Sequence, residues 1–65
     1  MRILLVEDEH RIAQAIKEGL EEDHYAVDIE HNGTDGYNAA LAEEYDLIIY
    51  DITTGKNYSK ELGFY

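Results

Sequence analysis

The sequence contains no cysteine and no proline, and only five of its 65 residues are basic. Without cysteine the chain has neither disulfides nor thiolate metal ligands, so nothing indicates an oxidising compartment and the cytoplasm is the expected location. Its first apolar run, residues 3–6, is much shorter than the ~20 apolar residues of a membrane span. We therefore expect a soluble protein without a membrane partner.

The scarcity of basic residues leaves a strong excess of negative charge. Fifteen acidic side chains against five basic ones give a formal net charge of -10, which repels nucleic-acid phosphates and argues against nucleic-acid contact by this segment. The hydrophobic share of 45% still indicates a globular chain. A chain this short buries only ~60% of its unfolded surface, so we expect a partner or a bound ion to stabilise it.

Three apolar segments are predicted to be strands. Residues 2–7 and 47–50 contain continuous apolar runs, typical of strands covered on both faces of a parallel sheet. Residues 25–29 alternate between apolar and small or polar side chains, which predicts an edge strand.

Two helices are predicted between these strands. Residues 9–22 form an amphipathic pattern, with apolar side chains at steps of four at Ile12, Ile16 and Leu20. Residues 34–44 form the second pattern, with Thr34 as the expected N-cap and Gly36 allowing a close approach to the sheet. The alternation β-α-β-α-β predicts an α/β fold with a parallel sheet and right-handed crossovers.

Acidic residues follow the first and third predicted strands. Glu7 and Asp8 end the first strand and Asp51 ends the third, so in a parallel sheet with these strands adjacent the three carboxylates converge. Clustered carboxylates favour a divalent cation bound through oxygen, and Mg²⁺ fits better than zinc because no histidine or cysteine accompanies them. Asp51 can then act as a nucleophile toward phosphorus.

The motifs extend this pattern over residues 1–52. The run from Arg2 to Glu9, RILLVEDE, is followed in register by several further matching pieces. These are Ile12-Ala13, Ile16-Lys17, Gly19-Leu20, Tyr25-Ala26-Val27-Asp28, Asn32-Gly33, Gly36, Ala40, Tyr45-Asp46-Leu47-Ile48-Ile49 and Asp51-Ile52. The combination resembles the N-terminal half of response-regulator receiver domains of two-component systems, especially the winged-helix transcription-factor subfamily. The resemblance implies a truncated flavodoxin-like fold with strand order 2-1-3.

The resemblance also implies roles for individual residues. Glu7 and Asp8 match the acidic pair that holds Mg²⁺ in the family, and Asp51 matches the aspartate that accepts a phosphoryl group from a histidine kinase. Thr53 falls where the family supplies a backbone carbonyl as a further metal ligand. The implied function is a phosphorelay in transcription regulation, not enzyme activity.

The match ends after Ile52, and residues 53–65 form a divergent tail. The leucine-proline turn is missing, as are the hydroxyl residue and the lysine that end the family's fourth and fifth strands. Lys56 and Lys60 show no spacing that directs them to Asp51. We therefore expect impaired signalling.

Without a fourth strand, the third strand would have an open apolar edge, which predicts completion of the core by homodimerisation. The alternative is that the tail folds back over this edge through Tyr58, Leu62, Phe64 and Tyr65. A structural half-domain that forms a homodimer without signalling is thus the second functional hypothesis. An engineered fragment, a fusion product and a frameshifted truncation are all compatible with the abrupt change.

Simpler interpretations remain open for the same residues. Asp8 and Glu9 also favour a helix N-terminus electrostatically, and Asp51 taken alone is typical of a turn after a strand. His10, His24 and His31 are expected to be solvated surface residues. A hydrolase is the least favoured function, because no base, oxyanion donor or glycine-rich phosphate loop accompanies the acids.

Overall fold

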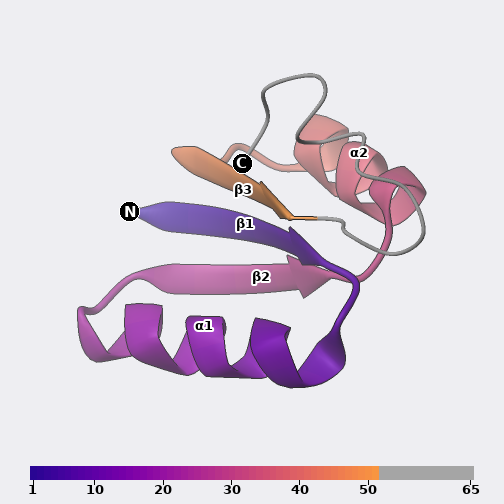
Figure 1. The fold of residues 1–65 in the computed structure, drawn as a ribbon. Helices are drawn as coiled ribbons and strands as arrows, with labels where there is room; N and C mark the ends of the chain where they lie inside the picture. Colours follow the sequence, from indigo (N-terminus) through magenta and orange to yellow (C-terminus); the bar gives the residue numbers. More distant parts are fainter. Residues whose placement is uncertain (52–65) are drawn as a thin grey trace.

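A computed structural model of the chain describes residues 1–51, so the predictions for Thr53 and for the tail lie outside the described residues. The sheet has three parallel strands in the order β2-β1-β3 (Figure 1). Their bounds are Arg2–Glu7 for β1, Ala26–Glu30 for β2 and Leu47–Asp51 for β3. This confirms the predicted truncated flavodoxin-like α/β fold with strand order 2-1-3.

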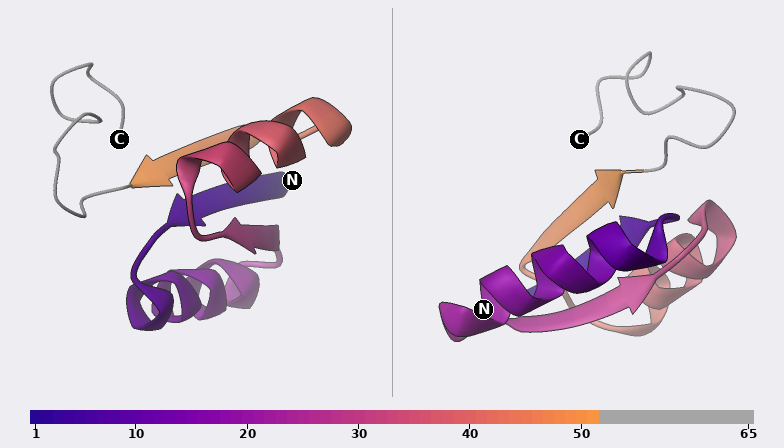
Figure 2. Two further views of the ribbon diagram at one scale, coloured as in Figure 1. Left: turned by 90° about the vertical axis from the view of Figure 1, so that its right-hand side faces the viewer. Right: turned by 60° about the horizontal axis from the view of Figure 1, so that its bottom comes forward.

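Two helices connect the strands and lie on opposite faces of the sheet (Figure 2). Helix α1 (His10–Glu22) leads from β1 to β2, and α2 (Gly33–Ala42) leads from β2 to β3. The central strand is therefore covered on both sides, and four consecutive side chains of β1 are at most 1% exposed: Ile3, Leu4, Leu5 and Val6. The continuous apolar run of β1 is explained by this two-sided burial.

Alternate residues of β1 contribute to the two faces, as the pleat of a strand requires. Ile3 and Leu5 pack with Ala13 of α1 and Val27 of β2. On the other face Val6 meets Gly36 of α2 so closely that a Cβ atom on this glycine would lie 2.6 Å from Val6 Cγ2. The predicted close approach of the second helix at Gly36 is confirmed.

The N-cap prediction for the second helix was wrong. Asn32, not Thr34, caps α2, because its side-chain oxygen accepts a hydrogen bond of 2.8 Å from the backbone N–H of Asp35. The first helix differs less from its prediction, since it begins at His10, one residue later than expected. Its buried residue is Ala13, whereas Ile12 is 49% exposed.

The third strand is not buried on both faces, contrary to its purely apolar sequence. Leu47 and Ile48 are 45% and 46% exposed, because β3 lies at one edge of the sheet and no strand within residues 1–51 pairs with its outer side. On α2 the side chains of Tyr37 and Leu41 are also mostly exposed. The described part of the chain thus has a well-buried centre and an apolar edge in contact with solvent.

Candidate functional site

The carboxyl ends of β1 and β3 bring two acidic residues opposite each other. Strand β1 pairs directly with β3, and the register places Glu7 opposite Asp51. Asp8 follows Glu7 at the start of the turn into α1. The adjacency of the first and third strands, on which the predicted carboxylate cluster depends, is confirmed.

Glu7 is the most unusual residue of this cluster because its side chain is buried. It is only 2% exposed, and its Oε2 atom accepts a 3.0 Å hydrogen bond from the backbone N–H of Glu9. Burial raises the pKa of the Glu7 carboxyl, the Glu9 amide opposes this, and the side chains of Asp8 and Asp51 raise the pKa further. The ionised form of Glu7 is therefore disfavoured where it stands.

No basic side chain within residues 1–51 offsets this effect at Glu7. The interactions of Glu7 there are with the Glu9 amide, the ring of His31, and the carboxyls of Asp8 and Asp51. A divalent cation is the simplest species that would stabilise the ionised form of Glu7 beside Asp8 and Asp51.

The donor set fits Mg²⁺, which prefers carboxylate oxygens. The residues that would hold it are Glu7, Asp8 and Asp51, while the predicted Thr53 carbonyl lies outside the described residues. Within residues 1–51 no three acidic, histidine or cysteine side chains have the arrangement of a ready metal site. Cation binding would therefore require the carboxylates to turn toward a common point.

Two histidines border the carboxylate cluster, and their contacts were not predicted. The Nδ1 atom of His31 lies 3.0 Å from the backbone oxygen of Glu7, and the His31 ring stacks on that of His10 with centroids 3.7 Å apart. The expectation of solvated surface residues is confirmed for His10 and His24, which are exposed, whereas His31 is partly buried. His31 directly follows β2, whose carboxyl end lies at the same edge of the sheet, so its position could have been inferred from the topology.

The three-stranded parallel sheet has the arrangement of a truncated flavodoxin-like domain, a class in which ligands bind at the carboxyl ends of the strands, where the acids lie here. Sequence comparison gives the class more narrowly. The chain is 47% identical over 51 residues to the transcriptional regulatory protein PcoR of Escherichia coli, and 44% identical over 52 residues to CusR of E. coli K12. It is also 47% identical over 51 residues to the response regulator ArlR of Staphylococcus saprophyticus.

These matches cover 78% to 80% of the chain and 23% of each relative, so the chain spans about a quarter of the length of the curated relatives it matches. No protein-family model matches the chain, and no solved structure matches it. The homologues are response regulators, and the chain corresponds to an N-terminal fragment of their receiver domain. None of the helices within residues 1–51 is long and apolar enough to cross a membrane.

Proposed function

We propose that the chain is a receiver-type signalling segment in which Asp51 accepts a phosphoryl group with the help of Mg²⁺. The observation that carries this proposal is the pairing of β1 with β3, which places Asp51 opposite the buried Glu7. Glu7 and Asp8 would hold the metal together with Asp51 and, as the resemblance implies, the Thr53 carbonyl. Bound Mg²⁺ would neutralise charge on the group being transferred.

In the proposed reaction a carboxylate oxygen of Asp51 attacks the phosphorus of a phosphohistidine on a partner kinase. The new O–P bond forms as the N–P bond breaks, and the released imidazole takes up a proton. Glu7 and Asp8 take no part in bond formation, and their role is to hold the Mg²⁺ ion next to the transferred phosphoryl group. A histidine kinase as partner, transcription regulation as the output and a cytoplasmic location belong to this proposal, by analogy with the relatives.

Acetyl phosphate tests this activity without a kinase. With Mg²⁺ present, intact mass measurement should show one added phosphoryl group on the wild-type chain, and Asp51→Asn should abolish it. Asp23→Asn is a matched control, because Asp23 is an exposed acid at the C-cap of α1. Equal labelling of wild type and Asp51→Asn, or no labelling of either, would contradict the proposal; weaker labelling than in a complete receiver domain agrees with impaired signalling.

A second proposal is that the chain is a structural half-domain that forms a homodimer through β3. It is favoured by the position of β3 at the edge of the sheet, where Leu47 and Ile48 are almost half exposed. Edge strands with apolar side chains favour pairing with another chain. Burial of this edge by a second copy would also supply the apolar area that a chain of this size needs.

Sedimentation equilibrium over a range of concentrations tests this proposal. A dimer that Ile48→Lys dissociates is the expected result. Ile12→Lys is the control, since Ile12 is 49% exposed and lies on α1, on the face of the sheet opposite to α2. A compact monomer at high concentration, or equal dissociation by both variants, would rule out pairing through β3.

A further inference from the structure

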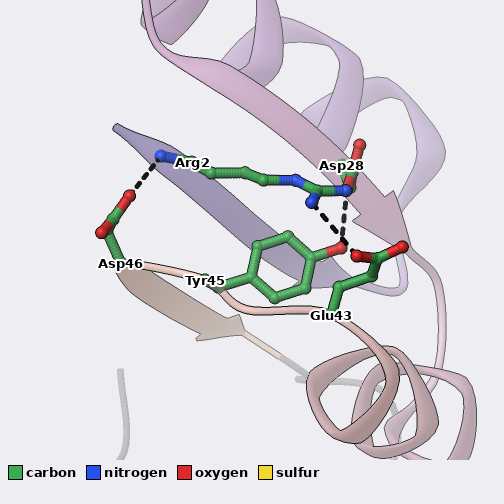
Figure 3. Close-up of polar contacts among 5 residues, drawn as sticks. All are labelled: Arg2, Asp28, Glu43, Tyr45 and Asp46. Carbon is green, nitrogen blue, oxygen red and sulfur yellow. Dashed lines mark hydrogen bonds and ion pairs between the residues drawn. The ribbon is translucent and has the colours of Figure 1, made fainter.

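A polar cluster at the amino ends of the strands joins all three strands and the end of α2. We define the Arg2 cluster as the five residues in Figure 3: Arg2, Asp28, Glu43, Tyr45 and Asp46. We propose that this cluster sets the register of β3 against β1 and thereby positions Asp51 opposite Glu7. Its members are positioning residues for the proposed phosphoacceptor site, so the inference rests on the proposed function.

The contact between Arg2 and Asp46 is made twice, once in each direction. The backbone N–H of Arg2 donates to Asp46 Oδ2 at 2.7 Å, and the backbone N–H of Asp46 donates to the Arg2 carbonyl at 2.8 Å. Asp46 directly precedes β3, so this pair fixes where β3 begins relative to the first residue of β1. The Asp46 carboxyl can accept the hydrogen bond from the Arg2 N–H only in the observed register of β3 against β1.

The side chain of Arg2 extends the cluster to β2 and α2. Its guanidinium donates to Asp28 at 3.0 Å and to Glu43 at 3.3 Å, and it lies 5.0 Å from the centre of the Tyr45 ring. The Tyr45 hydroxyl donates to Asp28 Oδ2 at 2.6 Å (Figure 3). The segment that enters β3 is therefore tied to β2 as well as to β1.

Such a device is needed because the apolar pattern of β3 specifies its register weakly. The residues of β3 before Asp51 form an uninterrupted apolar run. Leu47 and Ile48 lie on opposite faces of the sheet, and both are almost half exposed. If β3 slipped by one residue against β1, an apolar side chain would replace another apolar side chain at most positions of the strand. The same slip would move Asp51 to the other face of the sheet and ~3.3 Å along it. The polar contacts at residue 46 distinguish these registers.

The test compares Asp46→Ala with Asp46→Asn in the full chain, using nuclear Overhauser effects between β1 and β3 to read the register. Asp46→Asn keeps an Oδ acceptor for the Arg2 N–H and should retain the contacts between Glu7 and Asp51. Asp46→Ala should lose those contacts or show a second set. It should also bind Mg²⁺ about two- to tenfold more weakly, the range that loss of one hydrogen bond implies.

Two further variants separate positioning from general stability. Tyr45→Phe keeps the ring but removes the bond to Asp28, and it should weaken the β1–β3 contacts near residue 46 while the chain stays folded. Ile16→Val removes one methylene from the α1 side of the core, which costs a similar stability, and should leave register and Mg²⁺ affinity unchanged. Unaltered register in Asp46→Ala would overturn the proposal. If the wild type binds no Mg²⁺, the phosphoacceptor function fails while the register measurement still decides the role of the cluster.

Discussion

Both ends of the sheet carry acidic side chains, but the surroundings shift the pKa of a carboxyl in opposite directions at the two ends. At the amino ends, Asp28 receives hydrogen bonds from Tyr45 and Arg2, which lower the pKa of its carboxyl. At the carboxyl ends, Glu7 is buried beside two other acids and its pKa is raised. At one end the surroundings favour the ionised form of a carboxyl, and at the other they disfavour it.

This contrast is a reason to regard the carboxyl ends as the functional part. A carboxylate that is buried next to other carboxylates destabilises the native state near neutral pH unless a cation joins it. Clusters of this kind are typical of binding sites, where the binding energy of a ligand offsets the cost of holding like charges together. Substitutions at the two ends of the sheet and in the helices should therefore differ in size and sign.

The largest effect is expected where α2 packs behind the carboxylate cluster. In Gly36→Ala the new Cβ atom would lie 2.6 Å from Val6 Cγ2 and 3.0 Å from Val6 Cγ1, and the valine is buried. We expect overpacking to lower the free energy of unfolding by about 1–3 kcal/mol, measured by urea denaturation. Stability equal to or above that of wild type would show that α2 does not pack on Val6 as described.

Glu7→Gln should have the next largest effect, and of opposite sign. The substitution keeps an oxygen that can accept the Glu9 N–H but removes the buried charge, so the free energy of unfolding without Mg²⁺ should rise by about 1 kcal/mol at neutral pH. Added Mg²⁺ should stabilise the wild type and not the variant. A loss of stability in Glu7→Gln at neutral pH would contradict the unfavourable ionisation of Glu7.

The pH dependence of unfolding should differ between the two ends. Because the folded pKa of Glu7 is raised, its contribution to stability is present below its unfolded pKa, about 4.3, and is lost as pH rises through the folded value. Because the folded pKa of Asp28 is lowered, its contribution is present above its unfolded pKa, about 3.9, and is lost as pH falls through the folded value.

Urea unfolding across this pH range, in wild type and single variants, checks both signs. Glu7→Gln should reduce the loss of stability on the alkaline side, and Asp28→Asn should reduce the loss on the acid side. Parallel curves for wild type and both variants would mean that neither carboxyl has a different pKa in the folded state.

The smallest effect is expected at Gly19, which matches Gly36 in chemistry but not in surroundings. A Cβ atom on Gly19 meets no atom within 4 Å, and the residue lies exposed within α1. Gly19→Ala should therefore raise the free energy of unfolding by about 0.5–1 kcal/mol through helix propensity alone. Thermal denaturation of both alanine variants should give shifts of opposite direction, and destabilisation by both would remove the distinction.

The resemblance to receiver domains predicted the sheet order, which the structure confirms. The convergence of Glu7 with Asp51 follows from that order, because the carboxyl ends of adjacent parallel strands meet at one edge of the sheet. Apolar runs could not show how much β3 is covered, since coverage depends on what pairs with its outer edge. The N-cap was misplaced because Asn32 and Thr34 are both good caps, and only the backbone path chooses between them. The contacts of Arg2 and His31 join residues that are far apart in the sequence and have no local signature.

The central claim is that Glu7, Asp8 and Asp51 together form one cation site at the carboxyl ends of β1 and β3. A Mg²⁺ titration followed by amide chemical shifts tests it most directly, with Asp51→Asn as the probe and Asp23→Asn as the control. We predict saturable shifts at residues 7, 8 and 51 in wild type and in Asp23→Asn, and their loss in Asp51→Asn. Spectra of wild type that do not respond to Mg²⁺, or that respond equally in Asp51→Asn, would contradict the claim.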